Sequence, residues 1–277
     1  MRDNILTLII GKRSNLSSHL NSAIDNILLI STEDIEKSFN ELGLKSNAPI
    51  NIIFNNFQTS TKLNSLDTPT EYISKSILST AKVLEYIKNN NLKINKIIYT
   101  SSSSVYGNNT FCSEDDDLNP LSLHSALKIA NEKMIEKFSV DNNIDYTIAR
   151  IFNMYGGDDS FSIISKIILA YKNSDSISLV NSGNSVRDFI SIDDVVKIYD
   201  ILLKIKDIKT INIGTGMGVS IKSILKKLEK RDIVIDSINI FRDELKVSTA
   251  DNSKLLSLIG DYSFMDVHEY IEEEILC

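Results

Sequence analysis

A serine, a histidine and a lysine lie where a strand is predicted to end and a helix to begin. Ser102 follows the predicted strand 96–100, while His124 and Lys128 lie four residues apart near the start of the predicted helix 122–140. That spacing places both side chains on one face of the helix. Imidazole has a pKa of about 6.5, and a neighbouring ammonium group favours its neutral, proton-accepting form. A strand end followed by a helix start is typical active-site geometry, and His124 with Lys128 could transfer a proton there.

The loop after the predicted strand 6–10 has the position of a dinucleotide-binding loop. It reads G-x-x-S-x-x-S, with Gly11, Ser14 and Ser17 at the fixed positions. Glycines in such a loop let the backbone approach a pyrophosphate, which then lies at the N-terminus of the following helix. Only the first glycine is present here, in a chain that has ten glycines in all. Taken alone, the loop also fits a plain β-turn-α unit.

Arg13 and the end of the second predicted strand bear on the kind of dinucleotide. NAD sites commonly place a carboxylate there to accept a hydrogen bond from the ribose 2′-hydroxyl. Residues 30–32 are Ile, Ser and Thr, so no acidic residue closes this strand. Arg13 adds a positive charge near the loop. If a dinucleotide binds, this combination favours NADP over NAD.

The composition argues against several classes of function. The 277 residues carry a net charge of -7, with a pI of about 5.1, which disfavours a nucleic-acid or anionic-membrane surface. Cys112 and Cys277 are too few and too far apart for a disulfide framework or a zinc site, so no metal is expected. The apolar run 5–10 is shorter than a signal-peptide core, and no apolar stretch reaches the roughly 18 residues of a membrane span. We expect a cytoplasmic protein, with the basic stretch 226–231 as a solvated helix end.

Short β-branched stretches alternate with longer amphipathic ones. Strands are predicted at 6–10, 27–30, 50–54, 96–100 and 145–149, and helices at 16–23, 32–42, 70–89 and 122–140. This alternation indicates an α/β fold with a doubly wound, Rossmann-like parallel sheet. Shorter units after Arg150 predict a smaller C-terminal substrate lobe. We expect a dinucleotide-binding domain over 1–155, to which 185–213 return, and a substrate lobe over 156–184 and 214–277.

Six short motifs follow one another along the chain. They are SSSSVYG at 101–107, HSALK at 124–128, RIFNMYG at 150–156, RDFISIDD at 187–194, NIGTG at 212–216 and, after Arg242, DNSK at 251–254. In this order they resemble the extended short-chain dehydrogenase/reductase family, the NAD(P)-dependent epimerases and dehydratases of nucleotide sugars. The matching family patterns include S-S-x-x-V-Y-G, Y-x-x-x-K and R-x-x-N-x-Y-G. The chain is identified as a member of this family over most of its length.

The resemblance implies a role for each matching residue on the catalytic and cofactor side. Ser102 corresponds to the hydroxyl that hydrogen-bonds the reacting sugar oxygen. Lys128 corresponds to the lysine that binds the nicotinamide ribose. His124 occupies the position of the family's catalytic tyrosine, so the imidazole replaces a phenol. Gly11, Arg13, Ser14 and Ser17 would contact NADP or NAD.

On the substrate side, Asn153 would face the nucleotide sugar, and Arg187 and Arg242 resemble the pair that clamps its diphosphate. Guanidinium groups suit this task because they meet phosphate oxygens in bidentate fashion and remain charged. The alternative for each arginine is a salt bridge, to Asp188 or Asp243.

The departures from the family lie on the cofactor side. Besides His124 and the missing glycines, Ser76 stands where the long helix usually carries an asparagine. Only about twenty residues separate the second predicted strand from Ile50, which is room for one helix but not for a further strand and helix.

Three functions fit these residues. The first is an NAD(P)-dependent epimerase, dehydratase or keto-reductase of a nucleotide-activated sugar in cell-surface polysaccharide or glycan biosynthesis. Arg13 resembles the loop arginine of GDP-fucose synthase-type reductases, in some of which a cysteine near the position of Cys112 transfers a proton. The second is a catalytically degenerate member that binds a nucleotide sugar as a regulatory or partner subunit. The third is an enzyme that uses His124 and Lys128 without a dinucleotide. A homodimer through the two long central helices is common in this family.

Overall fold

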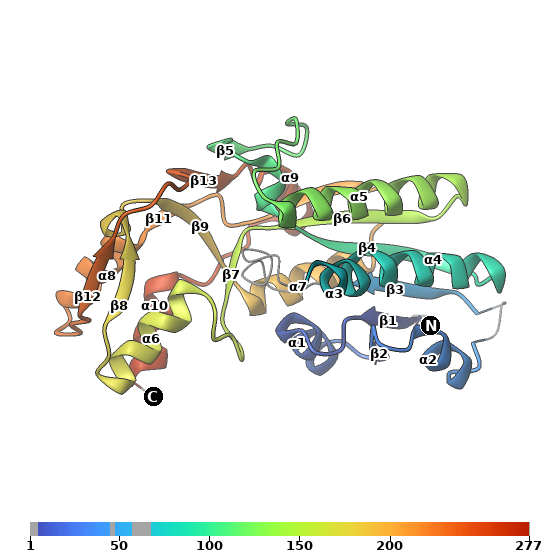
Figure 1. Cartoon of the computed structure of the whole chain (residues 1–277), viewed down its shortest axis with the longest axis horizontal. Helices are drawn as coiled ribbons and strands as arrows, with labels where there is room; N and C mark the ends of the chain where they lie inside the picture. Colours follow the sequence, from blue (N-terminus) through green and yellow to red (C-terminus); the bar gives the residue numbers. More distant parts are fainter. Residues whose placement is uncertain (1–4, 45–47, 57–67, 277) are drawn as a thin grey trace. The chain divides into compact units, whose positions relative to one another are not determined.

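Six strands among the described residues form the larger sheet, in the order β10-β6-β4-β3-β1-β2 (Figure 1). Their bounds are β1 Leu6–Ile10, β2 Ile27–Ile30, β3 Ile50–Phe54, β4 Ile94–Ser102, β6 Asp145–Ile151 and β10 Thr210–Ile213. The computed structural model describes residues 5–44, 48–56 and 68–276. β1 pairs in parallel with β2 and β3, and β3 pairs in parallel with β4. The predicted α/β fold with a Rossmann-like parallel sheet is confirmed.

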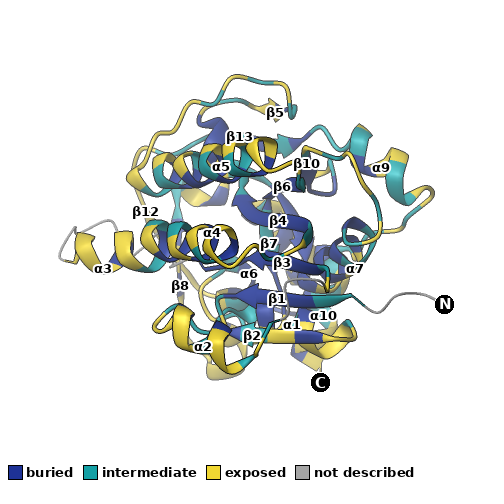
Figure 2. Ribbon diagram, turned by 90° about the vertical axis from the view of Figure 1, so that its right-hand side faces the viewer, coloured by how far each residue is buried: buried dark blue, intermediate teal, exposed yellow. Residues whose placement is uncertain are grey.

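Helices pack against this sheet, and their starts follow from local capping. α5 (Leu123–Asp141) begins at a capping box, in which the Ser122 hydroxyl accepts from the Ser125 N–H and the Ser125 hydroxyl from the Ser122 N–H. α2 (Ile35–Glu41) begins where the Asp34 carboxylate accepts from the Lys37 N–H, three residues later than predicted. Figure 2 shows buried strands beside helices with exposed outer faces, including α2 and α4 (Ser79–Asn89).

The core of this part joins strand and helix side chains. Leu8, Ile52 and Ile97 come from neighbouring strands and are fully buried, and Ile135 of α5 and Phe39 of α2 belong to the same cluster. Nearly continuous apolar strands of this kind are typical of a parallel sheet that is covered on both faces. Between β2 and β3 the described residues hold one helix, α2, and β3 pairs directly with β1, as the short spacing predicts.

The predicted helix 70–89 contains a wider turn. α3 (Pro69–Ile73) passes through a π-helical segment at Ser74–Leu78 before α4 begins. The Ser76 carbonyl oxygen accepts from Asn56 Nδ2 at 3.0 Å, Thr80 Oγ1 at 2.9 Å and Asn131 Nδ2 at 3.2 Å. A π turn displaces carbonyls from the regular helical ladder, and here polar side chains satisfy the displaced group.

A second set of strands surrounds β9 (Val186–Ser191), which pairs with β11 (Gly218–Ser220) in antiparallel fashion and with β13 (Val247–Ala250) and β7 (Asn153–Tyr155) in parallel. Further elements are β5 Phe111–Cys112, β8 Ile177–Val180, β12 Ser237–Ile240, α6 Ile163–Asn173, α7 Ile192–Leu202, α8 Ile221–Glu229, α9 Ser253–Ile259 and α10 Val267–Leu276. α6, α8 and α10 pack together around a second apolar cluster that includes Ile167, Ile224 and Ile271.

The chain divides into two compact units. The first comprises 1–105, 120–150 and 199–211, and the second comprises 106–119, 151–198 and 212–277. The predicted cofactor and catalytic residues lie in the first unit, including Ser102, which is also predicted to contact the substrate, and the other predicted substrate residues, Asn153, Arg187 and Arg242, lie in the second.

Candidate functional site

Gly11 ends β1 in a conformation that only glycine adopts readily. Its φ is +118°, and a Cβ at this position would lie 2.3 Å from the carbonyl oxygen of Asn55. The loop therefore passes so close to the end of β3 that no side chain fits here. A tight turn directly after the first strand is the role of the first glycine in a dinucleotide-binding loop.

The two serines of the loop are tied to Asn55. Asn55 Nδ2 donates to Ser14 Oγ and to Ser17 Oγ, both at 2.8 Å, and Ser17 Oγ donates to the Gly11 carbonyl at 2.8 Å. Ser14 is the N-cap residue of α1 (Asn15–Ala23), yet its hydroxyl makes no capping hydrogen bond. The Ser14 side chain therefore does not cap the backbone N–H groups in the first turn of α1. Backbone N–H groups at a helix N-terminus can bind an anion such as pyrophosphate. The sequence analysis did not identify Asn55. The feature that could have indicated it is its position as a polar residue directly after a buried strand.

Arg13 is paired with a carboxylate that the sequence patterns did not indicate. Its Nη2 lies 2.7 Å from Oε1 of Glu33, and the two side chains are 78% and 57% exposed. The N–H groups of Gly11 and Lys12 both donate to the Ile30 carbonyl, which ties the loop to the end of β2. Glu33 follows β2 by three residues, just past positions 30–32, where an acid is usually expected. A carboxylate is therefore present at this edge of the sheet.

Lys128 joins α5 to the end of β4. Its Nζ donates to the Thr100 carbonyl at 2.6 Å and lies 5.2 Å from the centre of the Tyr99 ring. The side chain is buried, and burial lowers the pKa of Lys128 well below its usual value, while Glu132 opposes the shift. Thr100 precedes Ser102 by two residues. The hydrogen bond from Lys128 to Thr100 therefore holds the start of α5 close to the end of β4, which carries Ser102.

His124 lies one helical turn before Lys128. Burial lowers the pKa of His124 to about 4, and the charge of Lys128 acts in the same direction. The imidazole is therefore neutral at neutral pH. Ser102 Oγ accepts from the Ser104 N–H at 3.2 Å, which leaves its hydroxyl proton for another acceptor.

Behind these residues lies a buried ionic group. Arg150 Nη2 lies 2.9 Å from Glu132 Oε2, with side chains 7% and 4% exposed, and Ser101 donates to Glu132 Oε1. Ser101 precedes Ser102, and Glu132 lies one turn after Lys128 on α5. Glu132 thus connects β4, which carries Ser102, to α5, which carries His124 and Lys128.

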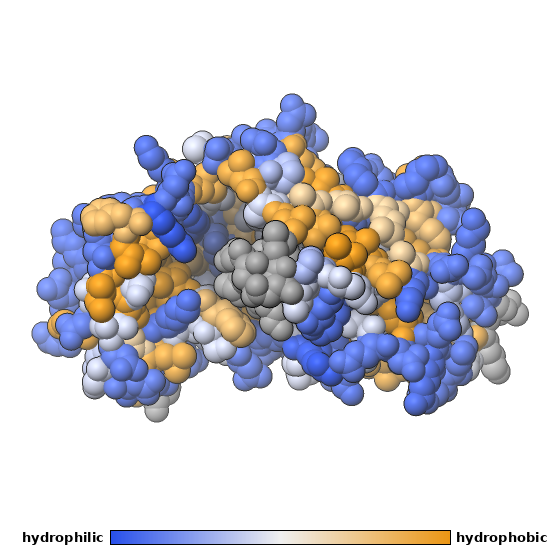
Figure 3. All heavy atoms as spheres, in the orientation of Figure 1, coloured by the Kyte–Doolittle hydropathy of each residue, from blue (hydrophilic) through white to orange (hydrophobic). Residues whose placement is uncertain are grey.

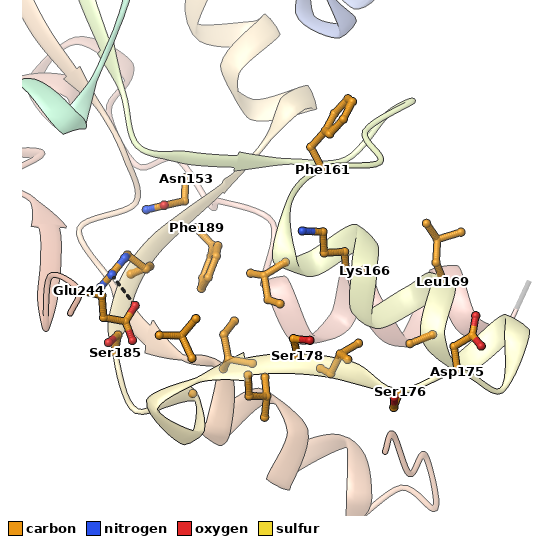
Figure 4. Close-up of a pocket in the computed structure, with 18 of the residues that line it drawn as sticks. Asn153, Phe161, Lys166, Leu169, Asp175, Ser176, Ser178, Ser185, Phe189 and Glu244 are labelled. Atoms are coloured by element: carbon orange, nitrogen blue, oxygen red, sulfur yellow. Dashed lines mark hydrogen bonds and ion pairs between the residues drawn. The ribbon is translucent and has the colours of Figure 1, made fainter. Parts of the chain in front are cut away.

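In the second unit, three of the four predicted substrate residues line one cavity of about 770 Å³, and the fourth, Ser102, is not among its lining residues. Figure 4 shows Asn153, Phe189 and Glu244 at one end of this cavity, and Leu169, Asp175 and Ser176 at the other. Arg187 and Arg242 also line it. Clefts of this volume accommodate small ligands of the size of a nucleotide sugar.

Hydrogen bonds orient the polar residues of the cavity. Asn153 Nδ2 donates to the Asp188 carbonyl at 3.0 Å, and Arg187 Nη2 lies 3.3 Å from Glu244 Oε2. The arginine is thus paired with Glu244 and not with Asp188, its neighbour in sequence. Burial lowers the pKa of Arg187, and Glu244 opposes this shift. Sequence reasoning missed Glu244, because nothing in the local sequence shows that it reaches Arg187.

Asp188 instead organises the Gly-Thr-Gly turn. Its carboxylate is buried and accepts from the N–H groups of Thr215, Gly216 and Ala250 and from the Thr215 hydroxyl. Cys112 is also buried, and burial raises the pKa of its thiol to about 11. A thiol with this pKa is a poor proton-transfer group near neutral pH.

These observations define a doubly wound α/β protein with a glycine turn at the first strand, and a second unit with an arginine-lined cavity. The chain belongs to the NAD dependent epimerase/dehydratase family, whose model matches residues 14–214. Within the described residues, we find no helix that combines the length and apolar character of a membrane span.

Two relatives are similar to the chain in sequence, and one solved structure is similar to it in fold. The chain is 37% identical to Protein CapI of Staphylococcus aureus over 145 residues, which cover 50% of this chain and 42% of that protein. It is 28% identical to a GDP-6-deoxy-D-talose 4-dehydrogenase of Aggregatibacter actinomycetemcomitans, over 74% of this chain and 72% of that one. The structure of MoeE5 in complex with UDP-glucuronic acid and NAD superposes with a TM-score of 0.83 at 23% identity, covering 98% of both chains. The first of these matches thus spans less than half of the relative's length.

Proposed function

We propose that this chain is an NAD(P)-dependent enzyme that acts on a nucleotide-activated sugar by epimerisation, dehydration or keto-reduction. The observation that carries the proposal is the cavity of the second unit, where Asn153, Arg187 and Arg242 come together. Arginine side chains with an amide beside them suit a diphosphate and a polar sugar. Family membership supports the reaction class, and named relatives act on GDP- and UDP-sugars.

The first unit supplies groups that fit a dinucleotide. Gly11 allows the tight turn after β1, the first turn of α1 offers N–H donors, and Lys128 would hold the nicotinamide ribose. When bound, the nicotinamide supplies hydride transfer. The protein supplies the proton: the neutral imidazole of His124 accepts it from a sugar hydroxyl, which the Ser102 oxygen orients by hydrogen bonding. The low pKa of His124 makes the resulting imidazolium a ready acid that returns the proton in the reverse step.

Binding measurements test this proposal. The purified chain is titrated with NAD, NADP and their reduced forms, and separately with UDP-, GDP- and dTDP-sugars, while its thermal unfolding temperature is recorded. We expect a dinucleotide and at least one nucleotide sugar each to raise that temperature, because ligands that bind only the folded state stabilise it. If no dinucleotide raises it, the enzyme proposal fails.

A second candidate is a non-catalytic subunit that binds a nucleotide sugar. The histidine at the tyrosine position and the serines tied to Asn55 favour it, because both changes fall on the cofactor side. A sugar nucleotide that stabilises the chain in the absence of any dinucleotide response supports this candidate. In an active enzyme, His124→Ala separates the roles, since full activity in this variant removes His124 from the mechanism.

A homodimer through the central helices is part of the proposal. Figure 3 shows apolar side chains on the face over α4 and α5, and the exposed residues of α5 include Leu123 and Val140. Light scattering on the purified chain and on Val140→Glu gives the molar mass of each, and a wild-type monomer contradicts the homodimer.

A further inference from the structure

We infer that the second unit has an additional anion site, a basic cleft that takes a compact phosphate-bearing molecule and is separate from the cavity of Arg187 and Arg242. The cleft has a volume of about 550 Å³, which suits a small ligand. The side chains that can contact an anion there are those of Ser220, Ser223, Lys226, Lys227, Lys230 and His268. The inference does not depend on the proposed function.

The basic cleft and the nucleotide-sugar cavity share no lining residue. Val186 lines the basic cleft, and the next residue of β9, Arg187, lines the cavity. Successive side chains of a strand point to opposite faces, so β9 separates the two sites. A ligand in the basic cleft is therefore not a second part of the proposed sugar site.

The lysines of the basic cleft are gathered on one face of α8. Ser223, Lys226, Lys227 and Lys230 follow the spacing i, i+3, i+4 and i+7, which places side chains on the same side of a helix. The sequence predicts a solvated helix end for this stretch. In the structure the same stretch forms one wall of a cleft, where its ammonium groups can converge on one anion.

Acidic side chains compensate only part of this charge. Lys227 Nζ lies 3.7 Å from Asp266 Oδ1. Within the part of the chain that the structure describes, Lys226 and Lys230 form no ion pair, and Glu229 on the same helix pairs with neither. Two positive charges thus remain in the basic cleft of a chain whose net charge is -7. Ammonium groups bind phosphate oxygens through charge-assisted hydrogen bonds, which are stronger than those between neutral groups.

Ser220 adds a neutral donor beside the lysines. Its Oγ accepts from the Ser223 N–H at 3.1 Å, which leaves the Ser220 hydroxyl proton for an acceptor in the basic cleft. The Ser223 hydroxyl donates to the Ser220 carbonyl at 2.7 Å, so this side chain is held at the start of α8.

His268 reports on the charge of the basic cleft. Its side chain is 13% exposed, and its Nδ1 lies 3.3 Å from Asp266 Oδ1. Burial lowers the pKa of His268 and the charge of Lys227 acts in the same direction, while Asp266 and Glu272 oppose the shift. A phosphate group bound beside the ring should raise this pKa, because a negative charge favours the imidazolium form.

The test is a titration with inorganic pyrophosphate at constant ionic strength, followed through the imidazole signals in NMR spectra. The chain has three histidines, so the signals can be assigned by replacing each one. His19 and His124 belong to the first unit, where they report on pyrophosphate at the predicted dinucleotide loop instead. The pKa of His268 is measured with and without pyrophosphate.

The variants are Lys226→Gln and Lys230→Gln, with Lys222→Gln as the matched control. Lys222 is an exposed lysine of the same helix that donates to Asn184 and lines neither the basic cleft nor the cavity. All three lysines are exposed, so their replacement should leave the thermal unfolding temperature nearly unchanged. Arg187→Ala is included to remove pyrophosphate binding in the cavity.

We expect pyrophosphate to shift the His268 signals and to raise the pKa of His268. Lys226→Gln and Lys230→Gln should each weaken this binding about three- to tenfold, because each removes one charged contact. Lys222→Gln should change it less than about twofold, since exposed charges outside the basic cleft are screened. Arg187→Ala should retain the His268 response.

Three results overturn the inference. An unchanged pKa of His268 in the presence of pyrophosphate means that the lysines are only a solvated helix end. An equal loss in Lys222→Gln means that the effect is one of general charge. Loss of the His268 response in Arg187→Ala means that pyrophosphate acts from the other cavity. The proposed function is tested separately, by the titrations with dinucleotides and nucleotide sugars, and none of these three results contradicts it.

Discussion

Arg150 and Glu132 form a buried ion pair in which Nη2 and Oε2 lie 2.9 Å apart, between strand β6 and helix α5. Ser101 adds a hydrogen bond to the same carboxylate, so β4, β6 and α5 meet at one charged group. Ser102 and Lys128 lie next to it along the chain. The positions of the predicted catalytic residues therefore depend on an ion pair whose two members are not themselves predicted site residues.

Glu132→Gln should lower the free energy of unfolding by about 3–5 kcal/mol, because it removes the Glu132 carboxylate from a buried ion pair. Urea denaturation measures the change. The matched control is Glu136→Gln on the same helix, where an exposed pair with Lys133 is removed at a cost below about 1 kcal/mol. A loss in Glu132→Gln no larger than that of the control contradicts the prediction.

His124 should make stability depend on pH in a defined window. Its folded-state pKa of about 4 lies below the unfolded value of about 6.5, so between these values the unfolded chain binds the extra proton. This contribution is complete above pH 6.5 and is lost as the pH falls through about 4, with a full size of about 3 kcal/mol.

The measurement compares urea denaturation of wild type and His124→Asn from pH 7 to pH 4. The difference between the two isolates His124 from His268, whose pKa is also lowered by burial. Wild type should lose stability relative to the variant as the pH falls. Parallel curves across this range would rule out the lowered pKa.

Gly11→Ala should lower the free energy of unfolding by more than Gly43→Ala does, because Gly11 combines a positive φ with a close backbone neighbour. Gly43 also has positive φ, at +53°, but a Cβ there would meet no heavy atom within 4 Å, whereas a Cβ on Gly11 would meet Asn55 O at 2.3 Å. Gly43→Ala should therefore cost only the backbone strain of about 1–2 kcal/mol. Thermal unfolding of both variants gives the comparison, and equal losses would show that the loop can move away from β3.

Arg187→Ala should weaken the binding of a nucleotide diphosphate about 10- to 100-fold, because the cavity loses a half-buried cation. Isothermal titration with UDP and GDP measures the change. Arg231→Ala is the control, since Arg231 is exposed, lies outside the cavity and pairs with Glu272. Unchanged affinity in Arg187→Ala argues that the diphosphate binds elsewhere.

Local patterns predicted most of the fold. β1, β2 and β3 have the predicted bounds, because each is a short β-branched run next to a turn. The late start of α2 follows from Asp34, a better cap than Thr32 at this position. The π turn at Ser74–Leu78 was not predicted, because it depends on Asn56 and Asn131, which are distant in sequence.

Site residues that belong to a sequence motif could be predicted. Site residues whose contacts are with partners far away in the sequence could not. Asn153, Arg187 and Arg242 come from separate motifs and line one cavity. Asn55, Glu33 and Glu244 belong to no motif, and each reaches its partner across 20 or more positions. Only the folded chain shows that Arg13 and Arg187 both have carboxylate partners.

The hydrogen bonds from Asn55 to Ser14 and Ser17 have an evolutionary consequence. Glycine at both serine positions would leave a buried amide without acceptors, at a cost of about 1–3 kcal/mol. Replacing both serines by glycine would carry that penalty unless position 55 changes as well. Substitutions at positions 14, 17 and 55 should therefore be coupled, and their effects on the free energy of unfolding should be strongly non-additive.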